Sequence, residues 1–154
     1  MLLFKASGQT YPGIIAHRRH AFHAKPQTFH RNELVLLSKN RTDCVGLEKQ
    51  VQYVGKLVHI RKPVSADEFE LYWPGARGAE RWNYVAELYC IQRLNVPFNL
   101  NEVRDLDWKH FKTVQGFAVF REPDATPLMR FLTATNPDIV LDLMNADPTV
   151  GRPT

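Results

Sequence analysis

Two tryptophans flank a segment that contains glycine and arginine. Of all the residues in the sequence, their type and spacing best fit the binding of a flat ligand by stacking. Trp73 precedes Pro-Gly in a loop, and Trp82 opens a strand-like run that also contains Tyr84. Aromatic faces stack on any nucleobase at roughly 1–3 kcal/mol each, so this group could hold a base taken out of its stack. Trp82 fits a core position equally well, and Trp108 fits the core better than a site.

Basic side chains near these aromatic residues could hold the phosphates of a nucleic acid. Arg77 and Arg81 bracket the expected pocket, and basic residues elsewhere could extend the track. The expected phosphate-binding residues are Arg18, Arg19, Lys39, Arg41, Arg77 and Arg81. Each of them taken alone is more often a solvated surface residue.

A polar loop, Ser38–Asp43, lies between two apolar runs that read as strands. Flanking strands fix where loop side chains point, which makes such a loop a plausible place for binding chemistry. We expect Ser38 and Asn40 to hydrogen-bond the edge of the base. Loops of this composition also occur without a function.

The charge of the chain favours an anionic partner. Lys and Arg number 20 against 16 Asp and Glu, which gives a formal charge of +4 and a pI near 9.2. The basic residues are concentrated in the first part of the chain, up to Lys62, where acidic residues are few. Phosphate backbones are common partners of such surfaces, and binding to them falls with salt.

Other chemistries have weaker support. His17, His20 and His23 are spaced by threes, as metal ligands on one helical face could be, but no cysteine or carboxylate follows closely to complete a set. A solvated or phosphate-facing basic surface is the simpler interpretation. The chain has no phosphate loop, dinucleotide fingerprint, HExxH, CxxC or GxSxG motif. We therefore predict neither a metal nor a cofactor.

Hydrophobic periodicity predicts short strands joined by turns and short helices. Strands are predicted over Leu2–Ala6, Glu33–Leu37, Gln50–Ile60, Trp82–Leu94 and Val114–Phe120. Helices are predicted over Ile14–Phe22, from Ser65, over Asn101–Leu106, Pro127–Leu132 and Asp138–Met144, the last with Asn136 as its N-cap. We predict turns at Tyr11–Gly13 and Pro97–Leu100. The fold class is α+β, a small β-barrel of about five to six strands decorated by short helices.

The length fits one domain over residues 1–146, followed by a tail, 147–154, that we expect to be disordered. No apolar run reaches the roughly 18–20 residues that span a bilayer, and the start does not resemble a leader peptide. A cytoplasmic protein without membrane contact is expected. Cys44 and Cys90 are too few for a disulfide framework and should be reduced.

Several segments together carry a family resemblance. The runs LLFKAS, ELVLLSKN, QYVGKLVHI, RWNYVAELYCIQRL and NVPFNLNEV, within Leu2 to Phe120, resemble the PUA-like superfamily, and within it the EVE domain, a relative of the YTH readers. Lys5-Ala6-Ser7 stands where EVE domains have an adjacent Lys-Ser pair, and Asn32-Glu33 replaces their Gly-Asp. Leu94–Leu100 matches their Leu-x-x-Pro-Val-x-Leu, with Phe98 for Val.

The resemblance implies a PUA-like barrel with an aromatic pocket that reads a modified base in DNA or RNA. The positions with motif support are Lys5, Ser7, Ser38 and Trp82. We expect a reader without enzymatic activity, with DNA favoured over RNA. Its target would be methylated or hydroxymethylated cytosine or N6-methyladenine, and a separate nuclease or effector protein could act with it. Lys5 would join the phosphate-binding set and Ser7 the base-binding set.

Two alternatives remain open at this stage. ASCH domains share the PUA-like barrel, and some members look like nucleases or small amidohydrolases acting on RNA or nucleosides. On that interpretation Lys5 would act as nucleophile or base, with Glu33 or Glu48 assisting and Tyr84 as acid. A protein-interaction module is the other alternative, and it would require an exposed apolar patch.

Overall fold

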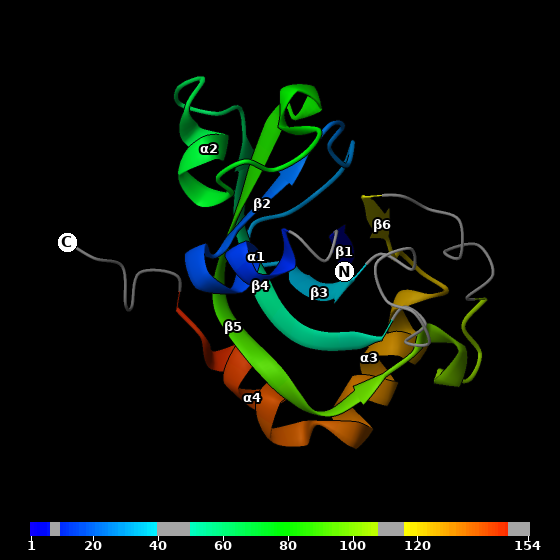
Figure 1. The fold of residues 1–154 in the computed structure, drawn as a ribbon. Coiled ribbons are helices and arrows are strands. Elements are labelled where there is room, and N and C mark those ends of the chain that lie inside the picture. The colour runs from blue at the N-terminus through cyan, green and yellow to red at the C-terminus, as the bar shows by residue number, and fades with distance from the viewer. Residues whose placement is uncertain (7–9, 40–49, 108–115, 148–154) are drawn as a thin grey trace.

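A curled sheet organises the chain in the computed structural model, which describes residues 1–6, 10–39, 50–107 and 116–147. Figure 1 shows this sheet, whose six strands lie in the order β2-β5-β4-β3-β1-β6. The strands are β1 (Leu2–Ala6), β2 (Arg19–Phe22), β3 (Leu34–Lys39), β4 (Val51–Arg61), β5 (Tyr84–Phe98) and β6 (Phe117–Val119). β1 and β3 run parallel, and the other neighbours are antiparallel. The sheet forms a half-barrel, which confirms the predicted α+β barrel.

Bulges between β4 and β5 give the sheet its curl. The register shifts between Val54 and Lys56, where β5 carries one extra residue, and Cys90 adopts a positive φ of 52° there. Such insertions bend a strand and increase its local twist. Gly55 lies opposite the bulge, and a Cβ on it would lie 3.1 Å from Cγ1 of Ile91. A glycine at this position therefore lets the bulged strand approach closely.

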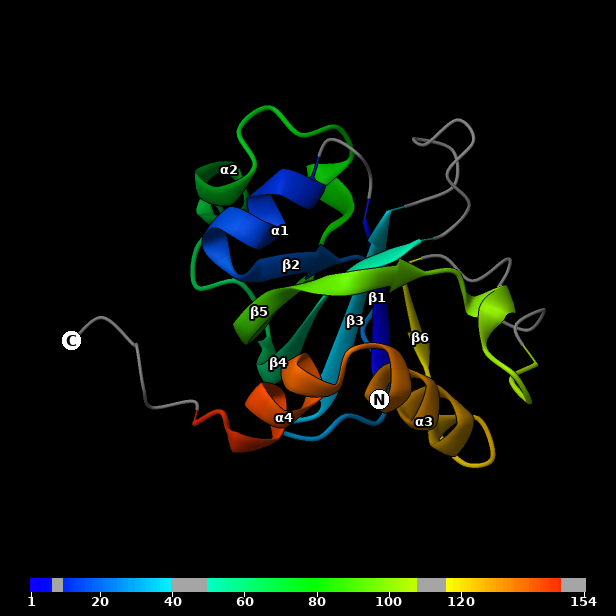
Figure 2. The ribbon, with the colours of Figure 1, turned by 90° about the horizontal axis from the view of Figure 1, so that it is seen from below.

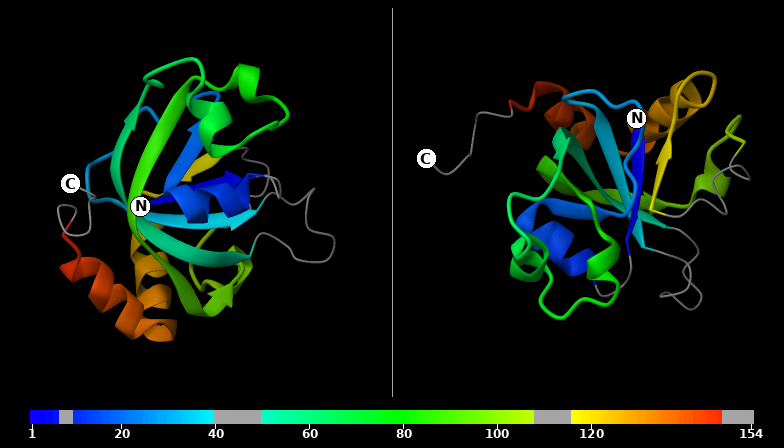
Figure 3. Two further views of the ribbon diagram at one scale, coloured as in Figure 1. Left: turned by 60° about the vertical axis from the view of Figure 1, so that its left-hand side comes forward. Right: turned by 90° about the horizontal axis from the view of Figure 1, so that it is seen from above.

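Helices cover both faces of the sheet (Figure 2). α1 (Tyr11–His17) and α2 (Glu68–Tyr72) lie on one face, and α3 (Ala125–Thr135) and α4 (Pro137–Asn145) lie on the other. Figure 3 shows α3 and α4 side by side, away from α1 and α2. Two 3-10 turns, η2 (Ala79–Arg81) and η3 (Leu100–Glu102), flank β5. Among the described residues, no helix is both long and apolar enough to cross a membrane.

The sheet separates two hydrophobic cores because successive side chains of a strand point to opposite faces. Leu3 and Leu36 pack with the buried residues of α3 and α4, and we call this the α3/α4 core. Phe4 and Leu37, next to them along the strands, pack with α1, α2 and Trp73 in the α1/α2 core. β1 is thus buried on both faces, as a central strand of mostly apolar residues should be.

The region around Arg18 corrects one prediction. The helix predicted over Ile14–Phe22 ends at His17, and Arg19–Phe22 forms β2, which pairs with β5. Arg18 has a left-handed φ of 56°, and a left-handed residue ends a helix. The turn predicted at Tyr11–Gly13 is the first part of α1 instead.

Further along the chain, the predicted bend at Pro97–Leu100 is also wrong, because β5 continues to Phe98. The stretch predicted as helical from Asn101 to Leu106 forms only η3. The terminal helices are confirmed, and both are longer than predicted. The predicted tail, apart from Asp147, lies outside the described residues.

Asn136 occupies the N-cap position of α4, as predicted, but its side chain makes no capping hydrogen bond. Its buried side chain lies against β5 instead, where Oδ1 accepts the Val96 N–H at 2.9 Å and Nδ2 donates to the Val96 carbonyl at 3.1 Å. The amide therefore makes the pair of hydrogen bonds that a neighbouring strand residue would make. Pro137 occupies the first helical position, where its missing N–H costs nothing.

Candidate nucleic-acid interface

Two buried polar residues lie side by side where β1 and β3 end. Lys5 and Ser38 are partners in the parallel register, with exposed fractions of 4% and 0%. The Ser38 hydroxyl has no hydrogen-bond partner among the residues that the structure describes. A buried polar atom without a partner costs about 1–3 kcal/mol and requires an explanation. One explanation is a ligand group that the hydroxyl would bind.

A lysine and two tyrosines cluster on the other face of the same strand ends. Lys39 Nζ lies 5.4 Å from the ring centre of Tyr11, within the range of a cation–π contact. The rings of Tyr11 and Tyr53 meet edge to face at 6.0 Å, and the Tyr11 hydroxyl donates to the Leu37 carbonyl at 3.4 Å. The sequence analysis missed both tyrosines. Pairing the two strands at the polar loop would have placed Tyr53 beside Leu37, but nothing local links Tyr11 to Lys39.

α1 connects this cluster to the other basic side chains. Tyr11 begins the helix beside Lys39, and Arg18 and Arg19 follow its last residue. At 1.5 Å per residue the helix separates these two ends by about 10 Å. Arg18 is exposed and Arg19 is half-buried. Lys39, Arg18 and Arg19 thus form a basic strip along α1, which we call the α1 strip.

Arg19 is held in place by its neighbours. Its Nη1 donates to the carbonyls of His17 at 3.2 Å and Arg18 at 3.1 Å, and its guanidinium carbon lies 5.9 Å from the ring centre of Tyr72. Its Nε lies 3.9 Å from a Glu87 carboxylate oxygen. These contacts orient the guanidinium at the end of α1, which favours binding because less side-chain freedom is lost.

The two tryptophans meet each other instead of facing a shared gap. Their ring centres are 5.4 Å apart at 76°, an edge-to-face contact that leaves no space for a base between them. Trp73 is 5% exposed, and its Nε1 donates to the Thr10 carbonyl at 3.1 Å. Trp82 is half-buried and also contacts Phe69 edge to face at 5.4 Å. Trp73 is therefore a core residue in this structure, and a stacking role remains open only for Trp82.

The other predicted residues lie apart from the β1 and β3 ends. Arg77 and Arg81 are exposed on the segment between α2 and β5. Tyr84 begins β5, where Lys25 Nζ lies 5.4 Å from its ring centre. Ser7, Asn40 and Arg41 lie outside the described residues, as do Trp108, Glu48 and Cys44.

The three evenly spaced histidines are not on one helical face, because His17 lies on α1 and His20 on β2. No group of three potential metal ligands occurs in the described part of the chain. His20 is 4% exposed, and its ring stacks on Phe4 at 5.2 Å and meets Phe22 edge to face at 4.4 Å. Burial lowers its pKa from 6.5 to about 3, so the ring is neutral at ordinary pH.

The residues of the enzyme alternative are separated by the sheet. Glu33 lies just before β3, and Ser38 is five residues further along the chain. Lys5 pairs with Ser38, so Glu33 and Lys5 are separated by roughly 16 Å along the strands. Glu33 instead forms an ion pair with Arg121 and accepts the His30 N–H at 3.0 Å. Burial alone would raise the pKa of Glu33, but these hydrogen bonds and that from the Met1 amino group lower it overall. Tyr84 lies on β5 beside β2, away from Lys5.

Comparison with solved structures shows that this fold is similar to that of an ASCH domain. The crystal structure of ASCH from Zymomonas mobilis matches with a TM-score of 0.56 and 13% identity, over 84% of this chain and 93% of that chain. A tyrosine-to-phenylalanine variant of it matches with a TM-score of 0.54 and 13% identity, over 84% and 96% of the two chains. A serine-to-alanine variant of the same protein matches with a TM-score of 0.55 and 14% identity, over 84% of this chain and 94% of that chain.

These likenesses agree with the small, helix-decorated barrel that the sequence predicted. At this level of identity they establish the fold alone. No protein-family model and no curated protein matches the chain.

Proposed function

We propose that this protein binds nucleic acid along the α1 strip and holds a modified base at the ends of β1 and β3. The observation that carries the proposal is the fully buried Ser38 hydroxyl, which has no partner among the described residues and lies beside Lys5. In a PUA-like half-barrel these residues end two central strands, so the sheet fixes their positions.

The α1 strip supplies the contacts to phosphates. Its length of about 10 Å corresponds to roughly three nucleotide steps of one strand at 3.4 Å each. Lys39 at one end and Arg18 and Arg19 at the other would position the backbone without reading the sequence. Arg77, Arg81, Lys5 and Arg41 would extend these contacts. Of the expected aromatic residues, Trp82 would stack on a base and Trp73 would support it from the core.

The Ser38 hydroxyl would supply the selectivity for the base. A site built to hydrogen-bond a polar group discriminates strongly, because without that group its own buried atom stays unpaired. Ser38 is closed to solvent in this structure, so the surrounding side chains must move aside to admit a base. Ser7 and Asn40 remain proposed contributors to the base-binding set, whereas Tyr84 lies beside β2, away from the ends of β1 and β3.

Replacement of Ser38 by alanine tests the base site. We expect selective binding of a modified oligonucleotide to weaken by about tenfold, equivalent to one lost hydrogen bond of about 1.4 kcal/mol. Removing a buried, unpaired hydroxyl does not destabilise the fold, so the melting temperature should stay level or rise. Binding is measured by fluorescence anisotropy on matched DNA and RNA oligonucleotides with and without 5-methylcytosine, 5-hydroxymethylcytosine or N6-methyladenine.

The same titrations can contradict the proposal. If Ser38→Ala binds every oligonucleotide as the parent protein does, the hydroxyl has no role in recognition. If the parent protein does not distinguish modified from unmodified strands, the base site is wrong even if the α1 strip is right. Preference for RNA or for DNA emerges from the same set of probes.

Replacement of Lys39 by glutamine tests the α1 strip. We expect weaker binding to all oligonucleotides and a plot of log affinity against log salt that is shallower by about 0.7–0.9, the contribution of one phosphate contact. Arg130→Gln is the matched control, because it removes the same charge from an exposed position on α3, on the other face of the sheet (Figure 2). Equal effects of the two variants would mean that only net charge matters.

We propose binding without turnover, because Lys5, Glu33 and Tyr84 are not assembled into one site. Recovery of unchanged nucleosides and RNA after long incubation is the expected result. Product that disappears in Lys5→Ala would favour the hydrolase alternative instead.

A further inference from the structure

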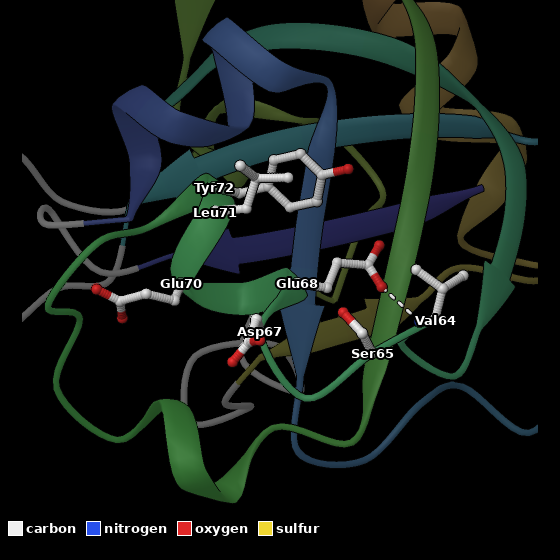
Figure 4. Close-up of a pocket in the computed structure, with 7 residues that line it drawn as sticks. All are labelled: Val64, Ser65, Asp67, Glu68, Glu70, Leu71 and Tyr72. Atoms are coloured by element: carbon white, nitrogen blue, oxygen red, sulfur yellow. Dashed lines mark hydrogen bonds between the residues drawn. The ribbon is translucent and has the colours of Figure 1, made fainter.

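A groove beside α2, drawn in Figure 4, has a volume of about 440 Å³. Val64 lines it from the segment after β4, and Leu71 and Tyr72 line it from α2. Val64 is 80% exposed and Leu71 is 69% exposed, which is unusual for aliphatic side chains that share one hollow. Apolar side chains exposed together and rimmed by polar groups mark interaction surfaces.

The groove is held in shape by a partly buried ion pair. Arg61 at the end of β4 binds both oxygens of Glu68, at 2.6 and 3.0 Å, so α2 is fixed to the sheet. Glu68 also accepts the Val64 N–H at 2.6 Å, as the dashed line in Figure 4 shows. The two walls of the groove are therefore tied together before any ligand arrives, which reduces the ordering cost of binding.

The charge of the groove is opposite to that of the chain as a whole. Three carboxylates line it, and neither lysine nor arginine is among its lining residues. Arg61 balances Glu68, but Asp67 and Glu70 are exposed at the rim. Glu70 accepts the Gly75 N–H at 3.1 Å, which fixes its carboxylate in place. A negative rim in a chain of charge +4 repels phosphate and attracts cationic groups.

We infer that this groove docks a protein partner through a short segment in which apolar side chains alternate with lysine or arginine. The apolar side chains would cover Val64 and Leu71, and the cationic groups would meet Asp67 and Glu70. Tyr72 forms the boundary between the groove and the α1 strip. It lines the groove, and its ring centre also lies 5.4 Å from that of His17 and 5.9 Å from the Arg19 guanidinium carbon. The groove therefore borders the α1 strip without sharing its charge, and one molecule can bind nucleic acid and a partner protein at once.

The test uses a fluorescein-labelled peptide in which leucine alternates with arginine. Two matched peptides replace arginine by glutamate or leucine by serine. The full chain should bind the first peptide and neither of the others. Leu71→Ser should weaken that binding at least tenfold, and Asp67→Asn should weaken it several-fold and reduce its dependence on salt. Both residues are exposed, so the melting temperature should not change.

Leu141→Ser is the matched control, because Leu141 is 59% exposed on α4, away from the groove. It should bind the peptide as the parent protein does. The inference is overturned if Leu71→Ser and Leu141→Ser behave alike, if the glutamate peptide binds equally well, or if sedimentation shows that Leu71 mediates self-association. All these measurements omit nucleic acid, so they stand or fall independently of the proposed function.

Discussion

Replacement of Trp73 by alanine is expected to lower the free energy of unfolding by about 3–5 kcal/mol, because a large buried indole is lost and a cavity remains. The side chain packs in the α1/α2 core beside Tyr72 and Trp82, with ring centres 5.7 and 5.4 Å away. A Cβ on Gly13 would lie 2.4 Å from its Nε1, so α1 approaches the indole as closely as a residue without a side chain allows. Domain stabilities are about 5–15 kcal/mol, so this loss is a large fraction of the total.

Urea unfolding followed by circular dichroism measures this effect, and Trp82→Ala is the comparison. Trp82 is half-buried, so its removal should cost less stability than that of Trp73. If Trp73→Ala keeps nearly all its stability and instead loses affinity for oligonucleotides, the indole belongs to a binding site and its assignment to the core is wrong. Affinities of both variants are compared at a temperature at which each is folded.

Acidification should destabilise the fold through His20. The folded pKa is depressed to about 3 by burial, below the ordinary value of 6.5. Between these two values the unfolded chain binds the proton and the folded chain does not, so the free energy of unfolding falls as the pH falls. The slope should be about 1.4 kcal/mol per pH unit, and it begins near pH 6.5.

The window above pH 4.5 isolates this histidine from the paired carboxylates. Glu33 and Glu68 have pKa values below 4.5 in the folded state. Burial opposes this for Glu33, but its hydrogen bonds lower the pKa overall; for Glu68 the hydrogen bonds from Arg61 are the main cause. Their contribution is present above pH 4.5 and is lost only below it. The part of the slope between pH 6.5 and 4.5 that is absent from His20→Leu therefore belongs to His20.

His20→Leu provides the measurement, since leucine fills a similar volume against Phe4 and Phe22. Urea unfolding at a series of pH values should show the slope in the parent protein and a much flatter line in the variant. Parallel lines for the two proteins would show that His20 gains its proton without unfolding, and would contradict the burial argument.

The strands could be predicted from sequence wherever the pattern of apolar residues along the chain matches the pattern of buried residues in the structure. β4 and β5 follow their patterns because each carries apolar residues at the spacing of a pleated strand, whereas β3 was predicted from a compact apolar run. β2 could not be predicted, since the break before it depends on a left-handed arginine. Arg18 lacks the usual signals for that conformation, which are glycine, asparagine or aspartate.

The site was harder to predict than the fold, because it depends on contacts between distant segments. Ser38 and Lys39 were predicted as site residues of a polar loop between two strands, but both are the last residues of β3. The neighbour relation of Lys5 and Ser38 arises from parallel pairing, which no local pattern encodes. The tryptophans were correctly grouped, yet their mutual edge-to-face packing depends on the contacts of Trp73 with Thr10 and Gly13 at the start of α1. Sequence proximity indicated that the rings meet but not whether they leave a gap.

The position of Asn136 has a consequence for how this protein behaves in a crowded solution. Beyond Leu88, β5 has β4 on one side and no second strand among the described residues, so its other side presents an open edge. Open edges invite pairing with other chains. The Asn136 amide occupies both backbone groups of Val96, and the next residue, Pro97, has no N–H to offer. One side chain and one proline thus protect the longest strand of the sheet against edge-to-edge aggregation.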